Sequence, residues 1–315
     1  MARYYALVAG LPNIGAEDRK LPISIEHFLE QTSEELTPAD ARLLRNLRLE
    51  EEHPQVIAFI EKCTASDLKG DPEEVDLPEN KLRLLDPRAL LMGIAQAQTQ
   101  GTIAKKNPLP DYLKAYLAYR FMDPEEAEEA KTFEDGTPKS ESLLRLEEDR
   151  LAAFYYRSMM KSKNKFCAQW AELNLNIKNV LALYTLRHLG WDAEQYIVGD
   201  NLIAQKLREA KGKDLGITAQ ELPLLPRITA IAEETDIARR ERLIDVLRWD
   251  WLEEQTFFKP FDVEVLLSYY LQLSIIERWL SLNEKTGEET FRRIVKDLKK
   301  QSTGALQEFK RKQKK

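Results

Sequence analysis

Residues 164–201 read NKFCAQWAELNLNIKNVLALYTLRHLGWDAEQYIVGDN, and this stretch decides the fold. Its large side chains recur three or four positions apart, which is the spacing of one buried face on a helix of about 3.6 residues per turn. They are Trp170, Leu173, Ile177, Leu181, Tyr184 and His188. The stretch therefore predicts a long helix that ends at Gly190, because glycine tolerates the left-handed conformation that closes many helices.

Three asparagines lie inside this predicted helix, at Asn174, Asn176 and Asn179. Asparagine competes with helical hydrogen bonding and weakens a helix interior by roughly a few tenths of a kcal/mol unless tertiary contacts use its side chain. Two arrangements are open. Either the three lie on a solvated face, or Asn176 and Asn179 hydrogen-bond backbone groups of a neighbouring helix or of a partner subunit.

The composition favours an all-α fold built as a multi-helix assembly of bundles. Of 315 residues, 32% are charged, 43% are hydrophobic and only 12 are glycine, which suits long helices with charged outer faces. A chain of this length can bury about three quarters of its unfolded surface. Residues 3–11 fit a strand or a helical turn, with helix favoured. Further helices are predicted at 141–161, 228–256 and 261–282.

Charge and apolar content divide the chain into four parts. Residues 123–142, DPEEAEEAKTFEDGTPKSES, are acidic and poor in large apolar side chains, so we predict a linker there. The linker separates an N-terminal helical part, 1–122, from a C-terminal helical part, 143–298. The remainder, 299–315, has seven Lys or Arg and one Glu, which predicts a basic tail on an acidic body.

From the sequence we expect no targeting or membrane-spanning segment. Its first apolar run is too short for a secretory signal, and the longest apolar candidate, 261–282, is interrupted by Asp262, Glu264, Glu277 and Arg278. We therefore expect a soluble, cytoplasmic protein. A net charge of -6 argues against general affinity for nucleic acid.

No local motif for catalysis or cofactor binding is present. The glycines at 212–216 lack the spacing of a phosphate-binding loop, and the two cysteines have no C-x-x-C spacing. His27, His53 and His188 are too far apart for a local metal site. We predict a protein that is not an enzyme and has no cofactor or metal. The remaining alternative is an enzyme whose site assembles only in three dimensions, which would show a deep pocket with shifted ionisable groups.

Four segments carry a resemblance to a known family. They are YYALVAGLP at 4–12, Asn176-x-x-Asn179-Val180 with Arg187, YIVGDN at 196–201, and Phe257-Phe258-x-x-Phe261 with Glu277-Arg278-Trp279. With these the chain resembles an uncharacterised bacterial family encoded among V-type ATPase subunits. That family is similar in turn to the V/A-type ATPase central-stalk subunit called C in prokaryotes and d in eukaryotes.

The resemblance implies a non-catalytic, all-helical, funnel-like adaptor for ion transport, which would couple the central stalk of the ATPase to its membrane ring. Its partners would be central-stalk subunits and that ring, and it would be peripheral to the inner membrane only through the complex. The residues assigned to structure or partner binding are Asn176, Asn179, Arg187, Gly199, Arg278 and Trp279. A helical scaffold or adaptor unrelated to the ATPase is the alternative.

Overall fold

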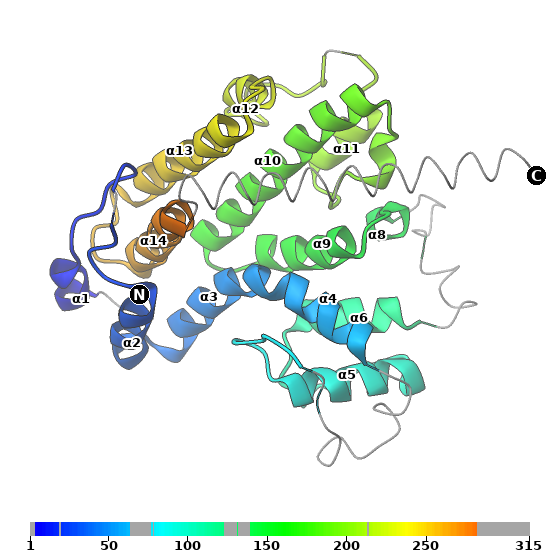
Figure 1. Cartoon of the computed structure of the whole chain (residues 1–315), viewed down its shortest axis with the longest axis horizontal. Coiled ribbons are helices and arrows are strands. Elements are labelled where there is room, and N and C mark those ends of the chain that lie inside the picture. Colours follow the sequence, from blue (N-terminus) through cyan, green and yellow to red (C-terminus); the bar gives the residue numbers. More distant parts are fainter. Residues whose placement is uncertain are drawn as a thin grey trace, which may run out of the picture. The chain divides into compact units, whose positions relative to one another are not determined.

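A computed structural model gives the fold of the chain. It describes residues 4–18, 20–63, 77, 79–122, 131, 139–212 and 214–281. Throughout these ranges the regular secondary structure is helical, without a strand, so the predicted all-α fold is confirmed (Figure 1). Most of the predicted linker and all of the predicted basic tail lie outside the described residues, and both stay predictions.

The chain divides into two compact units. Unit 1 combines Met1–Leu36 with Asp245–Lys315, and unit 2 spans Thr37–Ile244. The helices of the described residues are α1 (Tyr5–Gly10), α2 (Ile25–Glu35), α3 (Pro38–Arg48), η1 (Leu49–Glu52), α4 (His53–Lys62), α5 (Pro87–Gln100), α6 (Asp111–Arg120), α8 (Ser140–Leu143), α9 (Glu147–Met160), α10 (Lys165–Leu189), η2 (Ala193–Gln195), α11 (Leu202–Glu209), α12 (Leu225–Ala232), α13 (Ile237–Thr256) and α14 (Val263–Ser281), where η marks a 3-10 helix. The boundary between the units falls within α13.

Local sequence signals set several helix ends. The Thr37 side chain accepts a hydrogen bond from the backbone N–H of Asp40 at the start of α3, which satisfies a donor that the helix itself leaves unpaired. Gly190 closes α10 with a φ of 67°, as its sequence position predicts. The favoured helical interpretation of residues 3–11 is confirmed by α1.

Two helices predicted as continuous are broken. The predicted helix 141–161 separates into α8 and α9, because Leu144 and Leu146 are extended and the N–H of Arg145 donates to the carbonyl oxygen of Gln195 at 3.0 Å. The predicted helix 228–256 separates into α12 and α13. There Asp236 accepts from the N–H of Arg239 at 3.0 Å and caps α13, a signal that the apolar spacing concealed.

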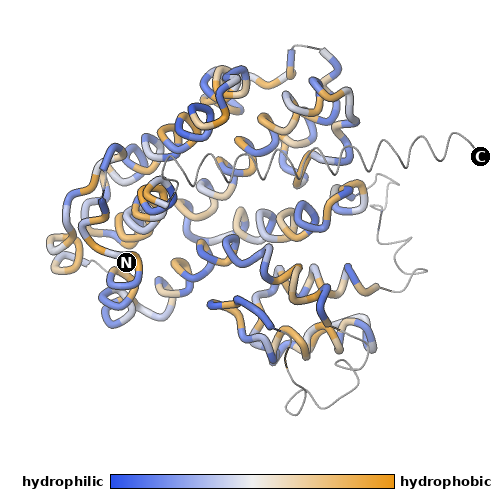
Figure 2. The backbone as a smooth tube through the Cα atoms, viewed as in Figure 1, coloured by the Kyte–Doolittle hydropathy of each residue, from blue (hydrophilic) through white to orange (hydrophobic). Residues whose placement is uncertain are grey.

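Unit 2 is built around α10. Helices α9, α11 and α12 all pack against α10, and α6 packs against α9 (Figure 1). Contact on several faces explains why α10 buries residues around much of its circumference, among them Leu175, Val180 and Leu183. Apolar and polar residues alternate along its backbone (Figure 2). The polar residues that α10 buries, Asn174, Asn176 and Asn179, therefore have to be satisfied inside the protein.

In unit 1, α14 packs against α2. The fully buried ring of Phe28 lies 5.4 Å from the ring of Tyr269 and 6.5 Å from that of Tyr270, measured between centroids. The Tyr269 hydroxyl donates to the carbonyl oxygen of Pro12 at 2.9 Å, which ties the segment after α1 to α14. Among the described helices, none is long and apolar enough to cross a membrane.

Candidate functional site

Asn179 holds the backbone of the turn at residues 197–201. Its Nδ2 donates to the carbonyl oxygen of Val198 at 2.7 Å, and its Oδ1 accepts from the N–H of Val198 at 2.9 Å. Both residues are fully buried. A single amide side chain thus satisfies the donor and the acceptor of one buried residue, as a paired strand would. Asn179 therefore bonds backbone groups, as one interpretation expected, but these belong to a turn of the same chain and not to a neighbouring helix or a partner subunit.

The other two asparagines are also buried, so the solvated-face interpretation is wrong for all three. Asn176 Oδ1 accepts from Nδ2 of Asn201 at 2.9 Å, and Asn201 Oδ1 in turn accepts from the N–H of Ala204 and caps α11. Asn174 differs, because its Nδ2 donates to Trp170 within its own helix at 2.8 Å. Asn176 and Asn179 therefore both join α10 to the turn, although Asn176 bonds a side chain where a backbone group was expected.

Gly199 and Arg208 complete the hold on this turn. Gly199 has a φ of 78°, and a Cβ added there would lie 3.1 Å from Leu175 Cδ2, so both conformation and space favour glycine. The Arg208 Nη2 donates to the carbonyl oxygens of Ile197, at 2.7 Å, and Gly199. Burial lowers the pKa of Arg208. Arg208 was not predicted from the sequence, because its spacing in α11 is that of any surface arginine.

Asp200, which follows Gly199 in the turn, carries a charged side chain. Arg157 of α9 forms ion pairs with Glu141 of α8 and with Asp200, the latter at 2.9 Å. Burial opposes the charge of Arg157, but the bonds to Glu141 and Asp200 outweigh burial and raise the pKa of the guanidinium. The ion pairs therefore connect α8 and α9 to the turn that α10 and α11 hold.

Of the other predicted residues, Arg187 contacts the far end of α11, and two lie in unit 1. The Arg187 Nη2 donates to the carbonyl oxygen of Ala210, just past the end of α11, at 3.0 Å. Arg278 and Trp279 lie in unit 1, where both donate to the buried Asp245 Oδ2, Trp279 through Nε1 at 2.7 Å. Their contacts join α14 to α13. The structure thus places the six predicted residues in two clusters.

A hollow of about 530 Å³ adjoins the network on the side of α6 and α9. Its walls combine apolar and charged side chains: Ala115, Ala118, Tyr119, Met122, Lys139, Glu141, Phe154, Arg157, Lys161 and Asp200. The Arg157 guanidinium lies 5.9 Å from the centroid of the Phe154 ring, a cation–π contact that fixes it further. Among the described residues of the hollow, both carboxylates, Glu141 and Asp200, form ion pairs with Arg157.

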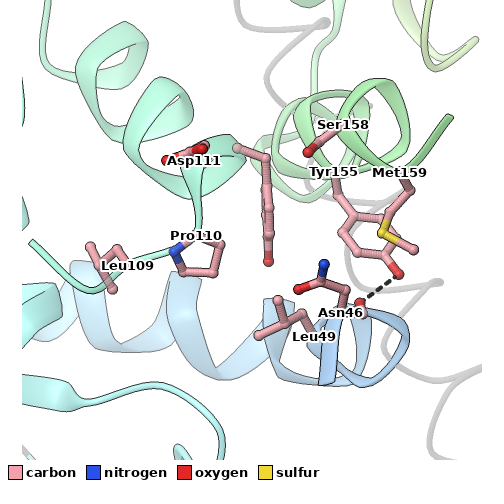
Figure 3. Close-up of a pocket in the computed structure, with 9 residues that line it drawn as sticks. Asn46, Leu49, Leu109, Pro110, Asp111, Tyr155, Ser158 and Met159 are labelled. Carbon is pink, nitrogen blue, oxygen red and sulfur yellow. Dashed lines mark hydrogen bonds between the residues drawn. The ribbon is translucent and has the colours of Figure 1, made fainter. Parts of the chain in front are cut away.

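A smaller cavity, of about 260 Å³, lies between α3, the start of α6 and α9 (Figure 3). The Tyr155 hydroxyl donates to the carbonyl oxygen of Asn46 at 3.1 Å at its wall, and Met159 lies beside them (Figure 3). Tyr112 also lines the cavity and lies 3.2 Å, Oη to Nε2, from His53.

Burial governs the titration of these groups. It lowers the pKa of His53 to about 4, with a further contribution from the charge of Lys178, and it raises the pKa values of Tyr112 and Tyr155. Each shift keeps its group neutral at neutral pH, whereas an acid–base catalyst needs a pKa near the working pH. The cavity therefore supplies hydrogen-bonding groups more readily than proton transfer. In the described part of the chain, no cluster of His, Cys, Asp or Glu could hold a metal ion.

The fold and the network define an all-α protein in which buried polar side chains fix one turn between two helices. Over residues 1–302 the chain matches a family described as "Protein of unknown function (DUF2764)", and it belongs to that family. The match covers both clusters of predicted residues. No curated protein and no solved structure matches the chain.

Proposed function

We propose that the protein is a non-catalytic subunit of a V/A-type rotary ATPase and couples the central stalk to the membrane ring. The sequence resemblance suggests this role. One structural observation supports it most: Asn176, Asn179 and Gly199, which carry the resemblance, meet at a single turn. Arg187, which also carries it, bonds the backbone just past the far end of the helix that follows this turn. These residues hold neighbouring backbone segments in place by hydrogen bonds and close packing.

Such an architecture suits a coupling subunit. A part that transmits rotation has to keep its shape under load and needs no reactive group. Side-chain bonds to the Ile197–Gly199 backbone come from Asn179 and Arg208, on two different helices. Each intramolecular hydrogen bond contributes about 1 kcal/mol net, and those involving a charged group contribute more. The turn therefore resists displacement relative to α10 and α11.

The proposal includes partners and location. The partners are the central-stalk subunits and the membrane ring, and the protein is cytoplasmic, peripheral to the inner membrane through that complex alone. The acidic body of the chain, with a net charge of -6, suits contact with basic surfaces of other subunits. A helical scaffold unrelated to the ATPase is the competing function.

Co-purification from the native host tests the proposal. A tag on the ring or on the shaft subunit should bring down this chain in a fixed ratio to an active ATPase. An Asn179→Ala variant should be recovered in a lower ratio, because the turn loses its clamp, and an Asn174→Ala variant should be recovered normally. An intact, active ATPase that contains none of this chain would end the proposal and favour the scaffold.

A further inference from the structure

Two adjacent phenylalanines are exposed at the turn between α13 and α14 in unit 1. Phe257 is 75% exposed and Phe258 is 88% exposed, and their rings form an edge-to-face pair with centroids 4.8 Å apart. Single exposed apolar residues are common on protein surfaces. Two neighbouring aromatic side chains with this much exposure are a concentrated apolar surface, of the kind that anchors protein interfaces.

The turn that carries the pair is held in place. The N–H of Lys259 donates to the carbonyl oxygen of Thr256 at 2.9 Å and closes the end of α13. On the other side, the N–H of Tyr4 donates to the carbonyl oxygen of Phe261 at 2.8 Å, and the Tyr5 ring lies 4.4 Å from the Phe261 ring. Because the backbone is already fixed, docking through this turn loses little conformational entropy.

The surface beside the pair is acidic. Of the four carboxylates in residues 253–264, three are not buried: Glu253, Glu254 and Asp262. The fourth, Glu264, is buried, and its Oε1 lies 3.9 Å from Nζ of Lys259, the one lysine of this segment. Glu253 and Glu254 are exposed in the last turn of α13. Negative charge here opposes approach to anionic lipid headgroups and favours a protein surface that carries lysine or arginine.

We infer that Phe257 and Phe258 insert into an apolar pocket, bordered by lysine or arginine, on a protein subunit of the ATPase. The inference rests on the proposed function and names the part of this chain that makes the contact. The two rings supply the apolar anchor, and Glu254 with its neighbouring carboxylates supplies the orientation.

The test is a binding titration with purified ATPase from a native-host strain that lacks this chain. The full-length wild-type protein should bind, and F257S/F258S should bind at least about thirtyfold more weakly, because central aromatic anchors typically contribute at least about 2 kcal/mol. A matched control, L146S/L189S, removes two other exposed apolar side chains, 44% and 53% exposed, and should bind as the wild type does. Glu254→Lys should weaken binding about threefold to tenfold and reduce its salt dependence.

The outcomes separate the inference from the proposed function. If the wild-type chain does not bind the ATPase, both fall. If the wild type and F257S/F258S bind equally well, the inference is overturned and the proposed function stands. Vesicles of phosphatidylcholine and phosphatidylglycerol form a third arm. Vesicle binding that depends on Phe257 and Phe258 would assign the turn to lipid and overturn the protein-pocket assignment, whereas absence of such binding supports it.

Discussion

The turn at 197–201, after α10, and the turn at 256–262, after α13, differ in which groups they bury and which they expose. At 197–201 the backbone is buried, and Asn179 and Arg208 reach in to satisfy it. At 256–262 the backbone forms hydrogen bonds within the turn and with the N–H of Tyr4, while the side chains of Phe257 and Phe258 are exposed. Polar side chains point inward at the first turn and apolar side chains point outward at the second. The first turn thus contributes to the free energy of unfolding, and the second presents a surface that a partner can bind.

The largest expected effect lies at the inward-facing turn. Asn179→Ala should lower the free energy of unfolding by about 4 kcal/mol, because it leaves the buried N–H and carbonyl of Val198 unpaired at about 2 kcal/mol each. Urea denaturation measures the change. Asn174→Ala, which removes the bond to the carbonyl oxygen of Trp170 within α10, should cost about 1 kcal/mol. Equal losses in the two variants would show that the two hydrogen bonds from Asn179 to Val198 stabilise the fold no more than a bond within one helix.

The pH dependence of stability tests whether unit 2 buries His53 in its neutral form. Burial holds its folded pKa at about 4 against 6.5 for the free side chain, so the unfolded chain takes up the proton first as the pH falls. Its contribution is complete above pH 6.5 and is lost progressively as the pH falls to about 4, by about 3 kcal/mol in total.

Urea midpoints from pH 7.5 to 4 measure this loss. Carboxylates titrate in the lower part of the same range, so the wild type is compared with His53→Gln, which cannot take up the proton. The slope of stability against pH should be shallower for His53→Gln. Parallel slopes would show that His53 is not buried as the structure places it.

Comparing alanine substitutions at two glycines separates the effect of backbone conformation on stability from the effect of side-chain packing. Gly199→Ala should cost about 2 kcal/mol, because alanine is strained at positive φ and its Cβ meets Leu175. Gly190→Ala shares the positive φ but has nothing within 4 Å of the added Cβ, and should cost about 1 kcal/mol. Thermal or urea unfolding of both variants gives the difference. A larger cost at Gly190 would contradict the contact with Leu175.

The outward-facing turn should show the smallest effect on stability. F257S/F258S should change the free energy of unfolding by no more than about 0.5 kcal/mol, because the two rings remain exposed in the folded protein. Denaturation curves that superimpose on those of the wild type are expected. A loss of 2 kcal/mol would mean that the rings are part of the core, and the contrast between the two turns would be lost.

Local patterns predict what lies within one helix. The spacing in 164–189 predicts α10, Gly190 predicts its end, and the unusual asparagines predict a tertiary use for Asn179. The contacts of Arg208 and Arg157 were not predictable, because they depend on how other helices pack and an arginine at those positions fits a solvated face equally well. The exposure of Phe257 was not predictable either, since aromatic residues are buried on average.

The central proposal, a coupling subunit, is tested most directly by measuring ATP-driven ion transport and ATP hydrolysis together in native-host membranes. In a strain without this chain, transport should fall to background while the catalytic head keeps hydrolysing ATP, and the wild-type chain should restore their ratio. Asn179→Ala, which weakens the inward-facing turn, should restore the ratio only in part. An unchanged ratio of transport to hydrolysis in the strain without the chain would contradict the proposal.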